Sequence, residues 1–470
     1  MPSVPLFGLA QSGKSRSVTS QSHTNLYAEI VQDAEKSRVV YYNTPGLLLF
    51  TSFGDTPIRG WIPVGDYIYA VHRGTFWRVD NAGTKTSMGT LSTTEGRVDL
   101  AYSGTQIAIA DGTSLYCFTV IGSAFVTVAS ALLPNPESVT FQDGYFICSF
   151  AVPSGVYQIS GLYNGTTFDA LDFATAESNP DGLVRVIADH GELVLCGEVT
   201  IEYASNTGGQ DFPYATLKGA TQEFGLAAKW SLTKFNDSLA GLFKNRMGQV
   251  QVMVMLGHSM KEISTPEMSS IINGYATVSD ATGFSYLLGG HPMYQINFPS
   301  AGKSWLFDAS TNLWSSLESG LSGGRHLGEI HADYLNKPRL TDYANGNIYT
   351  LSVDAYNDNG TQRPVEITSR HVFNGGKRST ISMMQVFFEA GSGLATGQGS
   401  TPEAMLTVSR DGGFTYGNEQ ARSIGAIGSY LARAVWRRLG QSRDWVFRIR
   451  VSDPVKVVIT GASLDLDIEK

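Results

Sequence analysis

The segment YIYAVHRGTFWRV, from Tyr67 to Val79, contains two strand-like stretches joined by a short turn at Gly74. Its apolar residues follow the two-residue period of a strand, whose successive side chains point to opposite faces of a sheet. Six later segments repeat this strand–turn–strand pattern, the last of them weakly. They begin at Gln106, Tyr145, Glu192, Ser238, Phe284 and Arg339. The sequence is therefore built largely on a repeated β-hairpin.

The spacing of these hairpins indicates their arrangement. Successive hairpins begin 39, 39, 47, 46, 46 and 55 residues apart, and a period of about 40 to 50 residues with strand content is typical of β-propeller blades. A blade has four antiparallel strands, so each hairpin would be its middle pair, with weaker strands such as those near Arg97 and Trp305 completing it. We predict an all-β protein with a propeller of six or seven blades over residues 26–360. An array of β-sandwiches or an irregular β-protein is the alternative.

The length and pattern of the strand-like segments change after Asp358. The turn-rich stretch NDNGTQRP is followed by long alternating strands, among them WVFRIRV, and by a Gly-rich loop at 391–402. In WVFRIRV the side chains of Trp445, Phe447, Ile449 and Val451 share one face. We therefore expect a separate β-sandwich-like domain over 361–470, a normal size for a sandwich.

The N-terminal end differs from both parts. Residues 1–25 are rich in Ser, Gly and Gln without a period, which predicts an extended arm. The best helical signal of the whole chain is short and spans Leu26 to Ala34. The first 15 residues lack the charged and apolar pattern of a signal peptide, and no apolar run reaches the roughly 18 residues of a membrane helix.

Composition excludes several classes. Of 470 residues 51 are Gly, 11% are aromatic and only 16% are charged; a disordered chain would be more charged, and a coiled coil would carry less glycine. The net charge of −8 disfavours a general nucleic-acid binder. Cys117, Cys148 and Cys196 are an odd number without a C-x-x-C pair, so we expect buried thiols in a protein folded in the cytosol, and neither disulfides nor a zinc site.

Two motifs invite a catalytic interpretation that their context does not support. Gly8 to Ser15, GLAQSGKS, fits the phosphate-binding loop pattern, but no buried strand precedes it and a poor helix former follows it, so we take it as a chance match. Ser409 to Gly417, SRDGGFTYG, resembles an Asp-box turn. There Asp411 would accept hydrogen bonds from the turn backbone, Gly413 would allow the turn and Tyr416 would pack below it. Asp boxes are structural, although they are common in sialidase propellers.

Nothing else in the sequence points to catalysis or to a cofactor. None of the 42 acidic residues forms a pair singled out by its context, and the eight histidines show no metal-binding spacing. We expect no catalytic residue, no metal and no cofactor.

A basic cluster near the C-terminus is the one charge asymmetry. Between Leu431 and Lys456 the net charge is +5, on an otherwise acidic chain. The cluster either contacts an acidic partner or neighbouring subunit, or forms a solvated strand face. Its candidate interface residues are Arg433, Arg437, Arg438, Arg443, Arg448 and Arg450.

Three segments together resemble the packaged-DNA stabilisation proteins, or tail hub (nozzle) proteins, of short-tailed bacteriophages. They are NLYAEIVQDAEKSRVVYYNTPGL (25–47), ESNPDGLVRVIADHGELVLCGEVTIEYASNTGG (177–209), and the C-terminal block from LTVSRDGGFTYGNEQ to VKVVITGASLDLD (406–467). They occur in the family's order and span most of the chain.

The resemblance implies a structural virion protein with no catalytic residues. Such proteins form a hexameric ring below the portal and its adaptor ring, extend the DNA channel and retain the packaged genome. A needle or plug closes the ring, and tailspikes or fibres dock on it. The expected location is the virion tail, after synthesis in the bacterial host cytoplasm. Double-stranded DNA would pass through the lumen without sequence-specific binding, and the protein would have no membrane span.

Two other classes remain open from the residues alone. A propeller glycosidase or other carbohydrate-active enzyme would require acidic residues that converge at the propeller mouth. A cellular interaction module would be a monomer with one binding face. The low charged fraction and the absence of a catalytic constellation favour a ring subunit over both.

Overall fold

The computed structural model describes residues 6–8, 15–32, 38–128, 134–151, 154–176, 179, 181–209 and 212–468. Nearly all regular structure in this part of the chain is β-strand. Its one α-helix is α1 (Pro266–Ile272), which begins at Pro266 after the Thr265 side chain caps the backbone N–H of Met268. No helix of the described residues has the length and apolar content to cross a membrane.

Seven small antiparallel sheets follow one another along the described chain, one for each hairpin of the sequence repeat. The first sheet holds β5 (Ile58–Val64), β6 (Tyr67–His72), β7 (Thr75–Val79) and β8 (Lys85–Thr90), and the second holds β9 (Asp99–Tyr102), β10 (Gln106–Ala110), β11 (Leu115–Thr119) and β12 (Ala124–Thr127). The third holds β13 (Pro136–Gln142), β14 (Tyr145–Phe150), β15 (Val156–Ile159) and β16 (Phe173–Thr175). The fourth holds β17 (Leu183–Asp189), β18 (Glu192–Gly197), β19 (Ile201–Asn206) and β20 (Tyr214–Thr216).

The remaining three sheets are less regular. The fifth holds β21 (Phe224–Leu226), the 3-10 turn η1 (Lys229–Ser231), β22 (Thr233–Lys234), β23 (Leu239–Asn245), β24 (Val250–Leu256) and β25 (Ser259–Glu262). The sixth holds β26 (Thr282–Leu288), β27 (His291–Phe298), β28 (Lys303–Asp308), β29 (Leu313–Ser319) and β30 (Gly324–Arg325). The seventh holds β31 (Gly328–Tyr334), β32 (Lys337–Asp342), β33 (Asn347–Ser352) and, from the N-terminal end, β4 (Gly46–Ser52).

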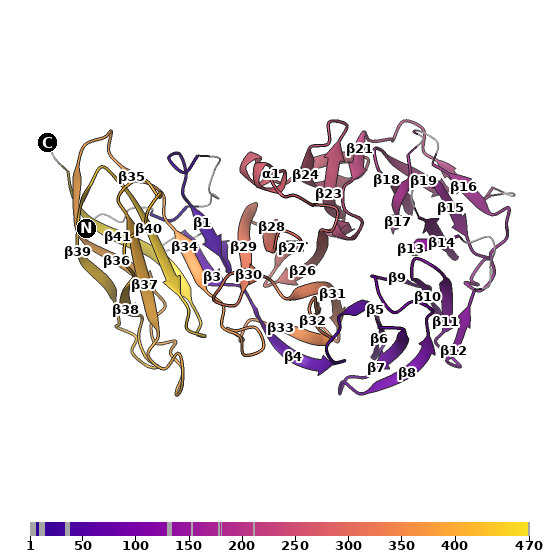
Figure 1. Cartoon of the computed structure of the whole chain (residues 1–470), viewed down its shortest axis with the longest axis horizontal. Coiled ribbons are helices and arrows are strands. Elements are labelled where there is room, and N and C mark those ends of the chain that lie inside the picture. The colour runs from indigo at the N-terminus through magenta and orange to yellow at the C-terminus, as the bar shows by residue number, and fades with distance from the viewer. Residues whose placement is uncertain are drawn as a thin grey trace.

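These sheets are the blades of a seven-bladed propeller. Neighbouring blades contact one another in a closed series that ends where β31 meets β5, and Figure 1 shows the blades arranged around a central axis. The ring closes because β4, the fourth strand of the last blade, precedes the first blade in sequence and pairs antiparallel with β33. The predicted propeller is confirmed.

Six of the seven predicted hairpins are the middle pair of their blade. The hairpin from Phe284 is the exception, because its strands β26 and β27 are the first and second strands of the sheet β26-β27-β28-β29. The prediction was wrong there because β28 and β29 continue the same alternation, so the sequence pattern does not mark the middle of this blade.

The C-terminal part is a two-sheet sandwich, as predicted. One sheet has the order β34-β40-β37-β38 with β35 beside β40, and the other has the order β2-β3-β41-β36-β39. The strands are β2 (Leu26–Ile30), β3 (Val39–Asn43), β34 (Val365–Thr368), β35 (Val372–Phe373), β36 (Ser379–Phe388), β37 (Glu403–Ser409), β38 (Gln420–Ser423), β39 (Ala434–Ser442), β40 (Asp444–Val451) and β41 (Val458–Ile468).

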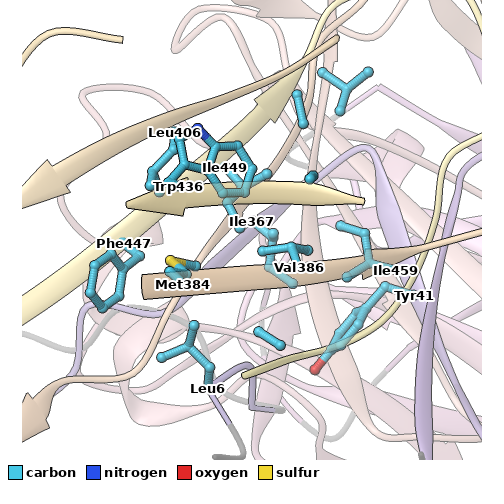
Figure 2. Packing of buried hydrophobic residues seen from close by; sticks show 14 of the residues in the cluster. Leu6, Tyr41, Ile367, Met384, Val386, Leu406, Trp436, Phe447, Ile449 and Ile459 are labelled. Atoms are coloured by element: carbon cyan, nitrogen blue, oxygen red, sulfur yellow. The ribbon is translucent and has the colours of Figure 1, made fainter. Parts of the chain in front are cut away.

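The sandwich core consists of apolar side chains from both sheets (Figure 2). Phe447 and Ile449 of β40 face Met384 of β36 and Ile459 of β41, as the alternation of WVFRIRV predicts. Leu6, from the N-terminal segment, is 2% exposed and belongs to the same cluster. The N-terminal end of the chain therefore contributes to the core of the C-terminal unit.

The short strand β1 (Ser22–Thr24) joins the two units. It pairs parallel with β29 of the sixth blade and antiparallel with β34 of the sandwich, so one sheet continues from the propeller into the sandwich (Figure 1). The domain boundaries at 25 and 360 remain predictions. The sequence placed β2 and β3 in the propeller range, but β3 pairs with the sandwich strand β41 and β2 pairs with β3.

The short helical signal of Leu26–Ala34 does not give a helix where the structure describes it. Residues Leu26–Ile30 form β2, in which Leu26 and Ala28 are buried, Tyr27 and Glu29 are half-buried and Ile30 is exposed. This alternation suits a strand facing a core, and pairing with β3 overrides the weak local helical preference. The end of this stretch, at residues 33 and 34, lies outside the described residues.

Candidate functional site

The six predicted interface arginines lie in two separate places. Four of them are on or beside β39, at the edge of the sheet β2-β3-β41-β36-β39: Arg433, Arg437, Arg438 and Arg443, all exposed. The other two, Arg448 and Arg450, are half-buried on β40, inside the opposite sheet. The structure does not gather the six residues into one patch.

The exposed four form what we call the β39 edge. Trp436 and Leu439 of this strand are buried in the sandwich core, whereas Arg437 and Arg438 both point outward. Two consecutive side chains can do so because the register with β36 shifts between Ile381 and Met383, which leaves a β-bulge in which Arg438 has φ of 59°. Charges and bulges protect exposed edges from indiscriminate strand pairing.

An apolar surface adjoins the β39 edge. The loop between β38 and β39 carries Ile427, Tyr430 and Leu431 with 63%, 76% and 95% of their surface exposed. Large apolar side chains clustered at such exposure are typical of contact surfaces. Together with the neighbouring Arg433, this end of the sandwich has the mixed apolar and basic character of a docking surface.

Arg448 and Arg450 are held by the protein itself. The Arg448 Nε lies 3.4 Å from the Glu366 carboxylate, and its guanidinium lies 3.9 Å from the centroid of the Tyr416 ring. Arg450 donates to the Leu321 carbonyl at 3.1 Å, which ties the sandwich to the loop after β29. Burial raises the pKa of Glu366, and these two arginines oppose the shift. Arg448 is thus held within the sandwich, and Arg450 is held at the junction between the two units.

The Asp-box turn has the geometry that its sequence predicts. Asp411 accepts hydrogen bonds from the backbone N–H groups of Phe414 and Thr415, at 3.1 and 2.9 Å, and from the hydroxyl of Thr415 at 2.5 Å. The side-chain and backbone bonds from Thr415 lower the pKa of Asp411 to about 2. Gly413 has φ of 89°, where a Cβ would be strained. The turn is structural.

The other sequence motifs add no site within the part of the chain that the structure describes. Most of the GLAQSGKS match, including Lys14, lies outside the described residues. The three cysteines are buried free thiols, and burial raises the pKa of Cys117 to about 11 and of Cys196 to about 12. Within the described ranges no group of three His, Cys, Asp or Glu side chains is arranged to hold a metal ion.

A cluster of charged residues around the propeller axis was missed by the sequence analysis. Trp230 of η1 has three cations over its ring, with Arg97, Lys229 and Arg185 at 4.5, 4.8 and 5.4 Å from the centroid. Arg97 precedes β9 of the second blade, Arg185 is on β17 of the fourth, and Lys229 lies beside Trp230 in η1 of the fifth. Their only signal in the sequence is a charged residue near the start of several repeats.

Two family models match the chain in succession. Residues 2–356 match the model described as bacteriophage P22 Gp10, beta-propeller, and residues 364–467 match the one described as bacteriophage P22 Gp10, beta-sandwich. The tail hub protein gp10 of Salmonella phage P22 is 24% identical over 442 residues, which cover 92% of this chain and 88% of that protein.

Similar solved structures include two propeller-sized chains. The computationally designed Ika8 protein has 12% identity and a TM-score of 0.40, covering 71% of this chain and 100% of its own. The N-terminal domain of Nup159 has 10% identity and a TM-score of 0.41, covering 71% and 99%. At TM-scores below 0.5 these similarities support no conclusion about this chain.

Proposed function

The chain belongs to the bacteriophage P22 Gp10 family, and from this premise we propose that six copies form a hub ring in a phage tail. The family identifies the protein as a structural tail hub component of the virion, not an enzyme. A carbohydrate-active propeller, the alternative left open by the sequence, is thereby excluded. The hexamer, its partners and its action on DNA are the proposed part.

The β39 edge is the observation that carries the proposed ring. Its four exposed arginines lie beside the apolar residues of the loop 424–433, on a chain whose net charge is −8. When the basic surface of one copy contacts an acidic surface of the next copy, the contact is heterologous. Repeated contacts of this kind form a ring when the rotation between copies closes. Complementary charge favours a contact between a basic and an acidic surface over a contact between two basic surfaces.

The proposed ring lies below the portal and its adaptor ring, after synthesis in the host cytoplasm. There it would extend the DNA channel, retain the packaged genome, receive a needle or plug and dock tailspikes or fibres. Six copies of a chain with net charge −8 carry −48 in total. An acidic lumen repels phosphates, which would let double-stranded DNA pass without sequence-specific binding.

The test replaces the four β39-edge arginines by glutamate and measures assembly. Light scattering after size-exclusion chromatography should find about six copies of the unmodified chain on a portal–adaptor assembly, and at least about tenfold weaker joining of the variant. The matched control reverses four exposed cations of the propeller, namely Lys218, Arg246, Lys261 and Lys337.

Both variants change the net charge equally, so the control separates a local contact from a general charge effect. Equal losses in both would contradict the β39 edge as the contact. An unmodified chain that does not join the portal–adaptor assembly at all would contradict the hub ring itself.

A further inference from the structure

A cavity of about 700 Å³ lies between the first blade and the sixth and seventh blades. Its walls come from the start of β5, the loop before β9, and the segment from β30 to β31. This volume is within the usual range of small-molecule sites. Its charged lining residues are Arg59, Arg73, Arg97 and Arg325 against Glu95 and Glu329.

Three of the four guanidinium groups have their partners within the chain. Arg59 donates to the carbonyls of Gly96, Arg73 and Thr93 at 2.6 to 2.8 Å. The side chain of Arg73 lies 2.9 Å from the Asp55 carboxylate. The Nη1 of Arg325 lies 2.8 Å from Glu329.

Arg97 is the cation without a carboxylate of its own. Of its neighbours around Trp230, Arg185 lies 3.5 Å from Asp99, and Lys229 lies 3.1 Å from Glu137. No ion pair of Arg97 is present among the described residues, and its buried Nη1 has no hydrogen-bond partner there. Buried cations and donors are nearly always paired in proteins.

The Arg97 group stays charged in this position. Burial lowers its pKa to about 10, an effect that the nearby Glu329 opposes. At neutral pH the side chain therefore brings a positive charge to a cavity wall on which arginines outnumber carboxylates. The buried, unpartnered Nη1 of this cation is costly unless a hydrogen-bond acceptor occupies the space beside it.

Two of these arginines also stack on aromatic rings. Arg97 lies over the Trp230 ring at 4.5 Å, and Arg325 lies over the Tyr343 ring at 3.7 Å. A guanidinium stacked on an aromatic face keeps its N–H groups in its own plane, where they can donate to oxygens. Both groups are close to the same carboxylate, Glu329.

We propose that this cavity binds a small phosphorylated molecule whose phosphate group lies between Arg97 and Arg325. A phosphate presents several oxygens, so it can accept from two guanidinium groups at once. The volume left beyond one phosphate accommodates the rest of a small organic ligand. This site is independent of the β39 edge and goes beyond the proposed hub ring.

Calorimetric titration of the full chain with inorganic phosphate, pyrophosphate and succinate, at constant ionic strength, tests the site. Saturable binding of phosphate or pyrophosphate with one site per chain is expected. Arg97→Gln and Arg325→Gln should each weaken it at least about tenfold, because each removes charge-assisted hydrogen bonds. Arg73→Gln, on the same cavity wall but paired with Asp55, should change it by less than about twofold.

Glu329→Gln provides a test of opposite sign that does not depend on removing a buried cation. It takes away the carboxylate that competes for Arg325, so phosphate should bind several-fold more tightly. Weaker or unchanged binding in Glu329→Gln, or no saturation below about 10 mM phosphate, would overturn the proposal. Tighter binding of succinate than of phosphate would overturn the phosphate assignment.

Discussion

Asn25 shows how one residue can connect distant parts of this chain. It is fully buried and has φ of 54°, a conformation that Asn tolerates better than most residues. Its Nδ2 donates to the carbonyls of Glu318 at 2.9 Å and of Pro364 at 2.7 Å, and its Oδ1 accepts from the Glu318 N–H at 3.0 Å. A single amide thus links β1, the sixth blade and the start of the sandwich.

We expect Asn25→Ala to lower the free energy of unfolding by about 3–5 kcal/mol. Buried backbone groups of Glu318 and Pro364 would lose their partners, and Ala is strained at positive φ. Urea denaturation measures the loss. Asn25→Gly should recover about 1 kcal/mol by relieving the strain. The control Asn359→Ala, exposed and at φ of 50°, should cost only about 1 kcal/mol; equal losses at both positions would contradict the role of the amide.

At the scale of elements, β1 is a strand because β29 and β34 pair with it, and not because its own residues favour a strand. Ser, His and Thr give no strong strand pattern, yet they pair with two strands that lie about 300 residues later. His23 in its middle is 3% exposed and stacks on the Tyr41 ring, with centroids 5.2 Å apart. Its Nε2 has no hydrogen-bond partner among the described residues.

From the burial of His23 we predict that the junction between the propeller and the sandwich is less stable in acid. Burial lowers the pKa of His23 from 6.5 to about 4, so the unfolded chain takes up its proton first, and the free energy of unfolding falls as the pH drops from about 6.5 to 4. His23→Phe removes this proton and keeps the stacking. Relative to the unmodified chain, it should gain up to about 3 kcal/mol over that range, measured by urea denaturation at several pH values.

His190→Phe is the control of opposite sign. His190 is exposed between Asp189 and Asp237, and its interactions with these carboxylates, Asp189 first, raise its pKa. The interaction of protonated His190 with these carboxylates therefore stabilises the fold at low pH. The variant lacks it, so it should lose stability relative to the unmodified chain on acidification. A pH dependence that His23→Phe leaves unchanged would show that β1 is not the acid-sensitive element.

At the scale of the whole molecule, the N-terminal segment holds the propeller and the sandwich together. It contributes β1 to the joint sheet, β2 and β3 to the sandwich and β4 to the last blade. At the linker, the buried Arg363 donates to both the hydroxyl and the carbonyl of Thr44. The continuous sheet and these buried bonds make us expect one cooperative unfolding transition.

Thr24→Pro should split that transition. Proline cannot donate to a sheet and is excluded from its interior, so the variant should lose about 2–4 kcal/mol of coupling between the units. Scanning calorimetry should then show two peaks. Thr127→Pro, at the exposed end of the outer strand β12, is the matched control and should keep one peak. A single peak in both variants would contradict coupling through β1.

Much of the architecture was readable from local pattern. The two-residue alternation marks strands and the hairpin period marks blades, because both depend on neighbours in sequence. For the same reason the Asp-box bonds of Asp411 and the core face of Trp445, Phe447 and Ile449 were predicted correctly. The division of the arginine cluster was not, because it depends on which sheet each strand joins.

The sequence by itself determined the strands, the seven repeats, the sandwich strands after residue 361 and the family resemblance. Only the tertiary structure decided that Leu26–Ile30 is a sandwich strand, that β4 closes the propeller and that Arg97 is left without a carboxylate. The physical reason is that alternation and turn chemistry act over a few residues, whereas strand partners and buried charge pairs are chosen among groups that meet only after the chain has folded.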